Sequence, residues 1–124
     1  MVIFKYGKNI HNLLVSIGHY GNGNLAIRLM MNDYESYTVL TVNFEEFKPL
    51  DRFSAFINME YLEGFDLEGF LNENNLGELT GRAVETPYCI FPEVRFNEET
   101  LKSLDEKNFE EYDAYSEALE FLNS

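Results

Sequence analysis

The chain has 124 residues, of which 45% are hydrophobic and 15% aromatic, and its formal net charge is -13 at pH 7. This composition is typical of one folded domain with a core, and it excludes an intrinsically disordered chain. The apolar runs are far shorter than a membrane span of ~20 residues. The first residues lack the pattern of a signal peptide, and the single cysteine, Cys89, excludes an internal disulfide. We therefore expect a soluble cytoplasmic protein.

The charge is unevenly distributed along the chain. Residues 1–44 contain three Lys/Arg and two Asp/Glu, a balance of +1, whereas residues 45–124 contain six and twenty, a balance of -14. Such a field disfavours direct binding of nucleic acid or of an anionic membrane, and it favours a basic protein partner. Solubility alone is the alternative explanation, and the oligomeric state stays open.

The first half of the chain predicts two hairpins. Val2 to Tyr6 and Ile10 to Ile17 alternate as two strands around a turn at residues 7–9. A second hairpin is expected over Asn22 to Phe44, with strands at residues 25–31 and 37–44. Both of its strands carry apolar groups on both faces, as expected in the middle of a sheet.

The second half mixes short strands with helices. We expect a strand from Phe53 to Asn58 and a helix that Asp66 caps and that ends near Asn74. Two extended segments, residues 79–85 and 88–96, are interrupted by Pro87 and Pro92, which confine them to an edge or a bulge. Two further helices are predicted, one capped by Asn97 and one opening at Asn108.

These elements predict an α+β fold with an antiparallel sheet of about five or six strands and two or three helices, the acidic ones at the C-terminus. Residues 1–124 form a single domain. Within it we expect a sheet-rich core at residues 1–96 and an acidic helical C-terminal extension at residues 97–124.

The last helix carries the sharpest candidate site. Glu110, Asp113, Glu117 and Glu120 are spaced three, four and three residues apart, so they form one stripe on a helix without an intervening Lys or Arg. The opposite side has the apolar signature of a core-facing helix, formed by Phe109, Tyr112, Tyr115, Leu119 and Leu122. The stripe predicts either a surface that imitates a row of phosphates or an ordinary solvated helix face.

Tyrosines beside acidic residues make rigid, amphipathic contact points at interfaces. We expect Tyr34, Tyr112 and Tyr115 to be partly exposed and to contribute to partner binding. The alternative is that they border the core.

Catalytic chemistry has little support in the sequence. Cys89 lies in an apolar extended run, and the histidines, His11 and His19, both lie in the first strands. A small-ligand protein or an enzyme that uses Cys89, His11 or His19 is the alternative to a binding protein. The carboxylates lack the spacing of a metal site, and we expect no cofactor and no metal.

Several segments resemble a family. These are Tyr20 to Leu29, Tyr37 to Asn43, Glu73 to Leu76, Thr80-Gly81-Arg82 and Tyr88 to Pro92. In this order they resemble a bacterial family of unknown function that is carried on plasmids and on conjugative or phage-like elements. The resemblance covers about residues 19–96 and not the acidic helices. It departs at Thr86-Pro87-Tyr88, where a Ser-Gly-Phe-like step is expected. The family implies no catalytic residues, but it implies a mobile-element context.

Together, the charge and the resemblance predict a non-enzymatic accessory protein of a mobile element. Its acidic surface would imitate nucleic acid and inhibit a basic host defence nuclease, such as a CRISPR effector or a restriction enzyme. Besides the small-ligand alternative, a structural subunit of the element remains open.

Overall fold

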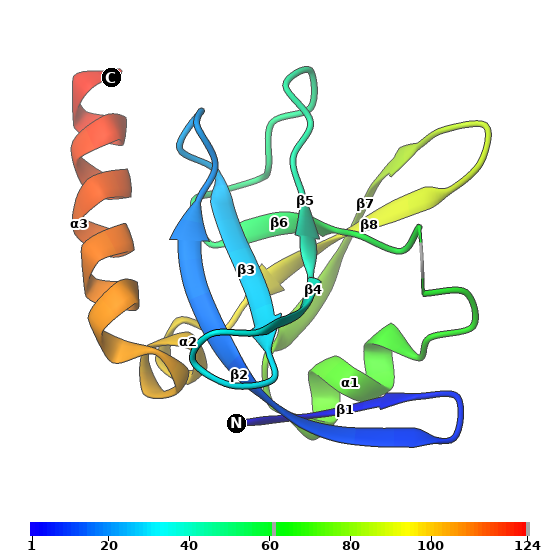
Figure 1. Ribbon diagram of the computed structural model, residues 1–124. Coiled ribbons are helices and arrows are strands. Elements are labelled where there is room, and N and C mark those ends of the chain that lie inside the picture. Colours follow the sequence, from blue (N-terminus) through cyan, green and yellow to red (C-terminus); the bar gives the residue numbers. More distant parts are fainter. Residues whose placement is uncertain (61, 124) are drawn as a thin grey trace.

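The computed structural model describes residues 1–60 and 62–123, and it contains two antiparallel four-stranded sheets and three helices in this part of the chain. The α+β class and the C-terminal helices agree with the sequence-based expectation. The strands are divided between two sheets, where the sequence suggested one. Figure 1 shows the two sheets crossing, with α3 standing along one side of the molecule and the β7–β8 hairpin projecting on the opposite side.

The first sheet has the order β1-β2-β3-β4. Its strands are β1 (Val2–Tyr6), β2 (Asn9–His19), β3 (Leu25–Met30) and β4 (Ser36–Val39). The long strand β2 pairs first with β1 and then with β3, and β3 pairs with β4. The first predicted hairpin is therefore confirmed, and the second is confirmed over β3 and β4. Alternate residues of β2 and β3 point into the core, which produces the period-two burial pattern.

The second sheet has the order β5-β6-β8-β7. Its strands are β5 (Thr41–Val42), β6 (Ser54–Ile57), β7 (Gly77–Glu85) and β8 (Ile90–Phe96). All four residues of β6 are buried, because this strand lies inside the sheet. The strand expected near Phe53 to Asn58 is therefore confirmed.

The chain passes from one sheet to the other at Leu40. The sequence predicted one strand over residues 37–44, but β4 ends at Val39 and β5 begins at Thr41. Leu40 is fully buried, and its amide donates to the carbonyl of Ile27 in the first sheet. Its own carbonyl accepts from the amide of Asn58, next to β6. Leu40 therefore joins the two sheets.

Pro92 lies in β8, an internal strand, and not at an edge. The strand tolerates it because β6 pairs only with Glu93, Val94 and Arg95 and ends before Pro92. On the other side, β7 has a register shift between Leu79 and Ala83, the bulge that the proline was expected to require.

The first two helices begin as predicted. In α1 (Leu67–Glu73), the side chain of Asp66 accepts from the amide of Gly69. In α2 (Glu98–Leu104), Asn97 accepts from the amide of Thr100. Both caps satisfy amides that would otherwise lack a partner in the first turn.

The third helix, α3 (Glu106–Leu122), begins two residues before the predicted start at Asn108. Asp105 ends α2 and also occupies the N-cap position of α3. Its carboxylate accepts from the side chain of Asn108 and, at 2.9 Å, from the backbone amide of Ile17 in β2. The expected cap was wrong because Asn108 binds Asp105 instead of opening the helix.

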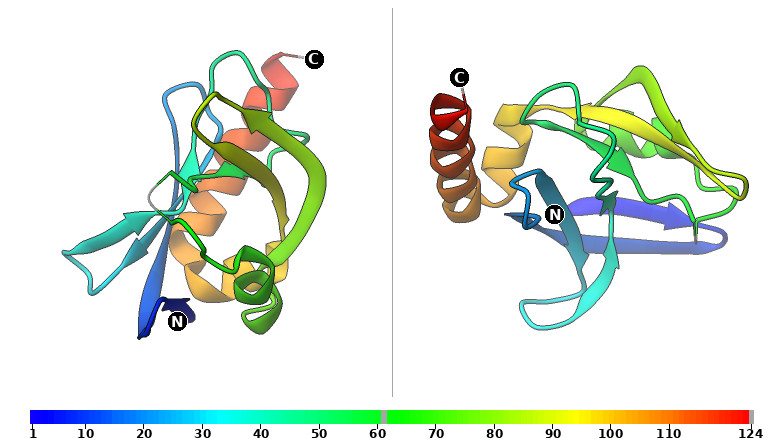
Figure 2. Two further views of the ribbon diagram at one scale, coloured as in Figure 1. Left: turned by 90° about the vertical axis from the view of Figure 1, so that its right-hand side faces the viewer. Right: turned by 90° about the horizontal axis from the view of Figure 1, so that it is seen from above.

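The two C-terminal helices share the main hydrophobic core with both sheets. Leu101 of α2 and Phe109 and Tyr112 of α3 are buried in the same cluster as Phe53 and Val15. The ring of Phe53 stacks on Phe109 with a centroid separation of 5.6 Å. In the right view of Figure 2, α3 is the outermost element on one side of the sheets, and in the left view it lies behind them.

Candidate functional site

The predicted stripe of four carboxylates is divided by the packing of α3. Glu110 and Glu117 are exposed, and so is Glu106, which precedes them on the same face of the helix. At ~100° per residue, these three side chains lie within about 40° of one another around the helix axis. We call Glu106, Glu110 and Glu117 the acidic ridge. Lys102 of α2 approaches Glu110 at 3.7 Å, but both side chains are mostly exposed, so this pair is weak.

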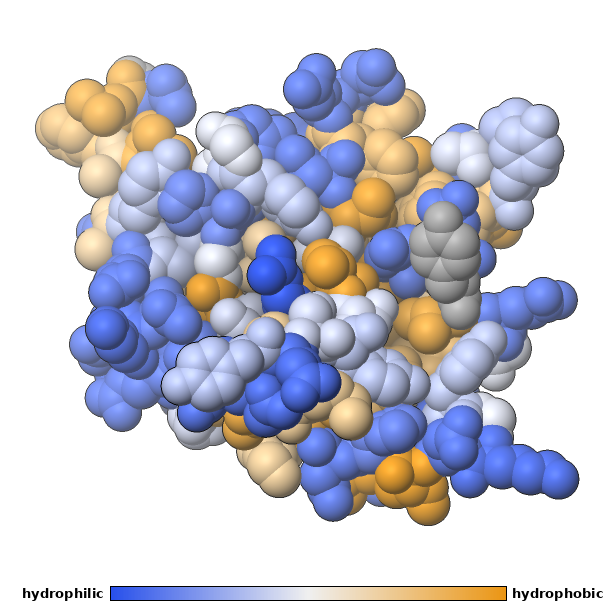
Figure 3. Space-filling model, in the orientation of Figure 1, coloured by the Kyte–Doolittle hydropathy of each residue, from blue (hydrophilic) through white to orange (hydrophobic). Residues whose placement is uncertain are grey.

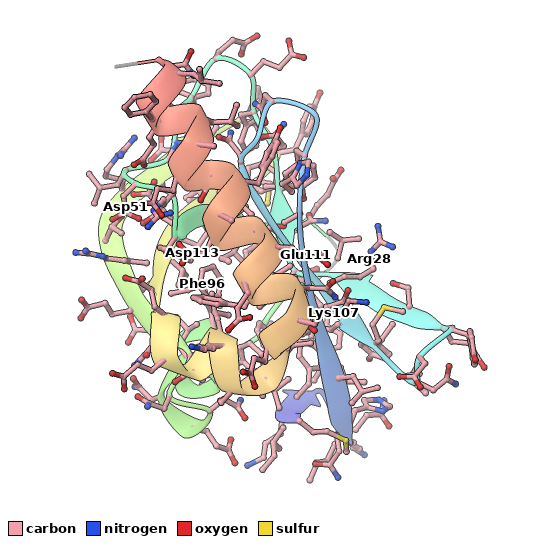
Figure 4. All side chains as sticks on the ribbon, turned by 90° about the vertical axis from the view of Figure 1, so that its left-hand side faces the viewer. Arg28, Asp51, Phe96, Lys107, Glu111 and Asp113 are labelled. Atoms are coloured by element: carbon pink, nitrogen blue, oxygen red, sulfur yellow. The ribbon has the colours of Figure 1, made fainter. Side chains whose placement is uncertain are left out.

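Asp113 does not belong to this ridge. Its Oδ1 lies 2.8 Å from Nη1 of Arg52, and in Figure 4 it lies on the side of α3 that faces Asp51. Nη1 of Arg52 donates its hydrogen bonds to the backbone carbonyl of Asp113 and to Oγ of Ser116. Oδ1 of Asp113 receives no hydrogen bond, so its contact with Arg52 is an ion pair only. The sequence assigned Asp113 to partner binding from its spacing on the helix. That spacing cannot reveal a contact with Arg52, which is 61 residues away in the sequence.

Tyr112 is also removed from the predicted interface. It is 2% exposed, and its hydroxyl donates to the carbonyl of Arg52. Burial raises the pKa of Tyr112 above its usual value; the carboxylates of Glu120 and Asp51 raise it further, while Ser116 and Arg52 lower it. Its expected exposure was wrong because it lies on the core-facing side of α3.

The other two tyrosines are accessible. Tyr34 is 94% exposed in the β3–β4 loop, and Tyr115 is 38% exposed. The ring of Tyr115 stacks on His19 with a centroid separation of 4.2 Å. Leu122 is 75% exposed, so the apolar side of α3 is buried only along its first turns. In Figure 3, hydrophobic colour covers the C-terminal end of α3 at the upper left, above a hydrophilic region.

The structure does not bring Cys89 together with a histidine. Cys89 lies in the β7–β8 turn and packs against the small cluster of Phe56, Val84 and Phe91. His11 packs on Tyr37 in the first sheet, and His19 packs on Tyr115. The described residues therefore contain no cysteine–histidine pair that could form an activated nucleophile.

Residues 1–60 and 62–123 contain neither a metal-binding cluster nor a membrane-spanning helix. No group of three or more His, Cys, Asp or Glu side chains is placed to hold a metal ion. No helix in these ranges has the length and apolar character needed to cross a lipid bilayer.

A cavity of about 360 Å³ lies beside the C-terminal half of α3. We call it the polar cavity. Three segments that are distant in the sequence form its walls: the β2–β3 turn, the loop that precedes β6, and α3. Its lining residues are Asn22, Gly23, Asn24, Leu25, Lys48, Pro49, Leu50, Asp51, Arg52, Ser54, Tyr112, Ser116, Leu119, Glu120 and Asn123.

The turn wall is fixed by side-chain amides. Nδ2 of Asn24 donates to Oδ1 of Asn43 at 2.9 Å, and Oδ1 of Asn22 accepts from the amide of Asn24. Just below, the hydroxyl of Tyr20 donates to the carbonyl of Thr41. These residues come from two of the segments that carry the family resemblance, Tyr20 to Leu29 and Tyr37 to Asn43. The contacts between them hold the turn that lines the polar cavity.

The loop wall is held by a buried carboxylate, Glu93 of β8, which is fully inaccessible to solvent. Its Oε2 accepts from the amide of Leu50 at 2.9 Å, and its Oε1 accepts from the hydroxyl of Thr80 at 2.7 Å. Arg82 approaches Oε2 at 3.6 Å and donates to the carbonyl of Lys48. Because a buried charge must be paired and hydrogen-bonded, this network fixes the loop on β7 and β8.

Sequence reasoning missed Glu93 and the polar cavity. The available signal was a charged residue within the apolar run from Ile90 to Phe96, combined with the nearby Thr80-Gly81-Arg82 segment. Gly81 has a φ of +88° in the β7 bulge, a left-handed conformation that suits glycine, and the bulge places Thr80 and Arg82 beside Glu93. The polar cavity had no such signal, because its walls meet only in the folded chain.

The arrangement supports two kinds of binding. The acidic ridge presents unburied carboxylates along ~16 Å of helix, which suits a row of cations. The polar cavity presents amides, hydroxyls and single charges of both signs, which suits a small polar molecule.

The comparisons assign the chain to a family. Residues 14–116 match the domain of unknown function DUF4313. The match includes α2 and most of α3, and so extends beyond the segments that carry the resemblance. No curated protein and no solved structure matches the chain. Because the matched residues span most of the sequence, the chain belongs to the DUF4313 family.

Proposed function

We propose that this protein is a non-enzymatic inhibitor whose acidic ridge binds the basic nucleic-acid site of another protein. The observation that carries the proposal is the exposure of Glu106, Glu110 and Glu117 on the outer face of α3, within a chain of net charge -13. Like charges at helical spacing repel one another mildly, and a basic groove would relieve this repulsion.

The proposed partner is a defence nuclease of the bacterial host, such as a CRISPR effector or a restriction enzyme. Such enzymes hold nucleic acid through Lys and Arg contacts to phosphates, which the ridge would occupy. A mobile-element origin, inferred from the family resemblance, supports this choice of partner.

The decisive variant reverses the ridge without disturbing the core. Glu106→Lys, Glu110→Lys and Glu117→Lys together change the net charge from -13 to -7, because each reversal adds two charges. Asp113 is left intact, since its loss would unpair Arg52. A matched control reverses Glu45, Glu46 and Glu78, which are exposed elsewhere, and has the same net charge.

The measurement is a tagged pull-down from bacterial lysate with mass spectrometry, followed by a nuclease assay on the captured protein. We expect the wild type and the control variant to capture and inhibit a basic nuclease, and the ridge variant to lose both properties. Capture should also fail at ~0.5 M salt, where screening is strong. Equal capture by all three proteins, or a salt-resistant partner, would rule out binding through the acidic ridge.

A further inference from the structure

We propose that the polar cavity binds a small zwitterion, a molecule with a free ammonium group and a free carboxylate, such as an amino acid or a dipeptide. This inference is independent of the acidic ridge, none of whose three residues lines the cavity. It also does not use Cys89, His11 or His19.

The size and lining of the polar cavity fit such a ligand. Its volume of about 360 Å³ falls at the lower end of the ~300–1,000 Å³ that small-molecule sites occupy. The lining combines three leucines with three asparagines: Leu25, Leu50, Leu119, Asn22, Asn24 and Asn123. The asparagine amides can donate to a carboxylate or accept from an ammonium group.

The charges in the lining determine the ligand class. Arg52 is neutralised by Asp113, and Asp51 by Arg95 at 3.3 Å. Two lining charges remain, Lys48 in the loop and Glu120 on α3, and neither forms an ion pair with another residue in the described ranges. One uncompensated cation and one uncompensated anion on different walls complement a ligand that carries both signs.

Both walls that carry these charges are fixed in place. The backbone at Lys48 and Leu50 is anchored by Arg82 and by the buried Glu93. On α3, Ser116 is 4% exposed and its hydroxyl lies 3.2 Å from Nη1 of Arg52. Because binding loses less entropy when a site is already ordered, this rigidity favours capture of a small molecule.

The test uses L-glutamine and L-alanyl-L-glutamine as probes, each titrated to ~20 mM against the isotope-labelled full chain, well above a weak Kd of ~1 mM. Two blocked forms of the dipeptide serve as ligand controls: the N-acetyl form lacks the ammonium charge, and the C-terminal amide lacks the carboxylate. We expect saturable shifts of the backbone amides of Asn24, Ser54 and Ser116 with at least one free probe. Each blocked form should bind about fivefold more weakly, as expected for the loss of one exposed charge pair.

Two variants assign each end of the ligand to one wall. Lys48→Met should weaken the free dipeptide about fivefold and leave the C-terminal amide unaffected, because that form has already lost the carboxylate. Glu120→Gln should likewise weaken the free dipeptide about fivefold. It should leave the N-acetyl form unaffected, because that form has already lost the ammonium charge. Lys8→Met and Glu106→Gln, both outside the polar cavity, are the matched controls and should bind as the wild type does.

The proposal is overturned if neither free probe produces saturable shifts at the lining residues. It is also overturned if the blocked forms bind as well as the free dipeptide, since the site would then recognise no charge. Neither result depends on capture of a nuclease, so failure here is distinguishable from failure of the acidic ridge.

Discussion

Tyr112 and Asp113 are adjacent in the sequence but have different roles in the structure. Tyr112 fills the core beneath Arg52, whereas Asp113 approaches the guanidinium of the same arginine. Both fix the loop that precedes β6 onto α3. Arg52 therefore contacts two of the seven residues that the sequence assigned to partner binding.

The buried hydroxyl of Tyr112 predicts a loss of stability in alkali. Burial raises its pKa in the folded state, so its contribution is fully present below the ordinary value of about 10 and is lost as the pH rises above it. Tyr112→Phe cannot ionise. Below pH ~9 this variant should be less stable by ~0.5–1.5 kcal/mol, because it lacks the hydrogen bond to Arg52.

The free energy of unfolding in urea, measured for both proteins from pH 8 to pH 11, tests this prediction. The wild type should lose more stability than Tyr112→Phe, so that the two curves converge in alkali. Parallel curves across the whole range would show that the ionisation of Tyr112 is not linked to folding.

At the scale of secondary-structure elements, α3 is held against the β2–β3 turn through a glycine. Gly23 has a φ of +90°, and a Cβ at this position would lie 2.5 Å from Cδ1 of Leu119. A side chain at this position would therefore need both a left-handed backbone conformation and a shift of the Leu119 side chain. Both residues line the polar cavity.

We expect Gly23→Ala to destabilise the protein by ~1–3 kcal/mol, because the new methyl group meets Leu119 and the backbone is strained. Gly21→Ala is a control two residues away, where an added Cβ meets nothing within 4 Å. Its effect should stay within about 0.5 kcal/mol or be slightly stabilising.

Thermal or urea unfolding of the two variants measures the difference. Adding Leu119→Ala to Gly23→Ala should cost less than Leu119→Ala costs alone, because it removes the steric part of the defect. Equal stability of Gly23→Ala and Gly21→Ala would contradict the close approach of the helix and the turn.

At the scale of the whole molecule, the net charge of -13 opposes the compact state. The five ion pairs among the described residues include only one carboxylate, Glu93, that is completely buried. Exposed pairs contribute little to stability, so long-range repulsion dominates the electrostatic balance.

Salt should therefore stabilise the folded protein. Between ~0.01 M and ~1 M NaCl the Debye length falls from ~30 Å to ~3 Å, and the urea midpoint of the wild type should rise. The ridge variant, with a net charge of -7, should gain less over the same range. If salt lowered the midpoint, or raised it equally in both proteins, repulsion between carboxylates would not be the cause.

The sequence by itself determined the local structure and the overall charge. The strands of the first hairpin, the caps at Asp66 and Asn97 and the bulge beside Pro92 were predictable, because they depend on neighbouring residues and on fixed periodicities. The exposure of Glu110 and Glu117 followed from helical spacing in the same way.

Only the tertiary structure decided how these elements meet. Leu40 divides one expected strand between two sheets, Arg52 pairs with Asp113, and Glu93 anchors the loop at Leu50. Glu93 and Leu50 are 43 positions apart in the sequence, and Arg52 and Asp113 are 61 positions apart. Local propensities do not determine contacts between residues so far apart. Which carboxylates stay free on α3, and that a polar cavity exists beside them, therefore depends on long-range packing.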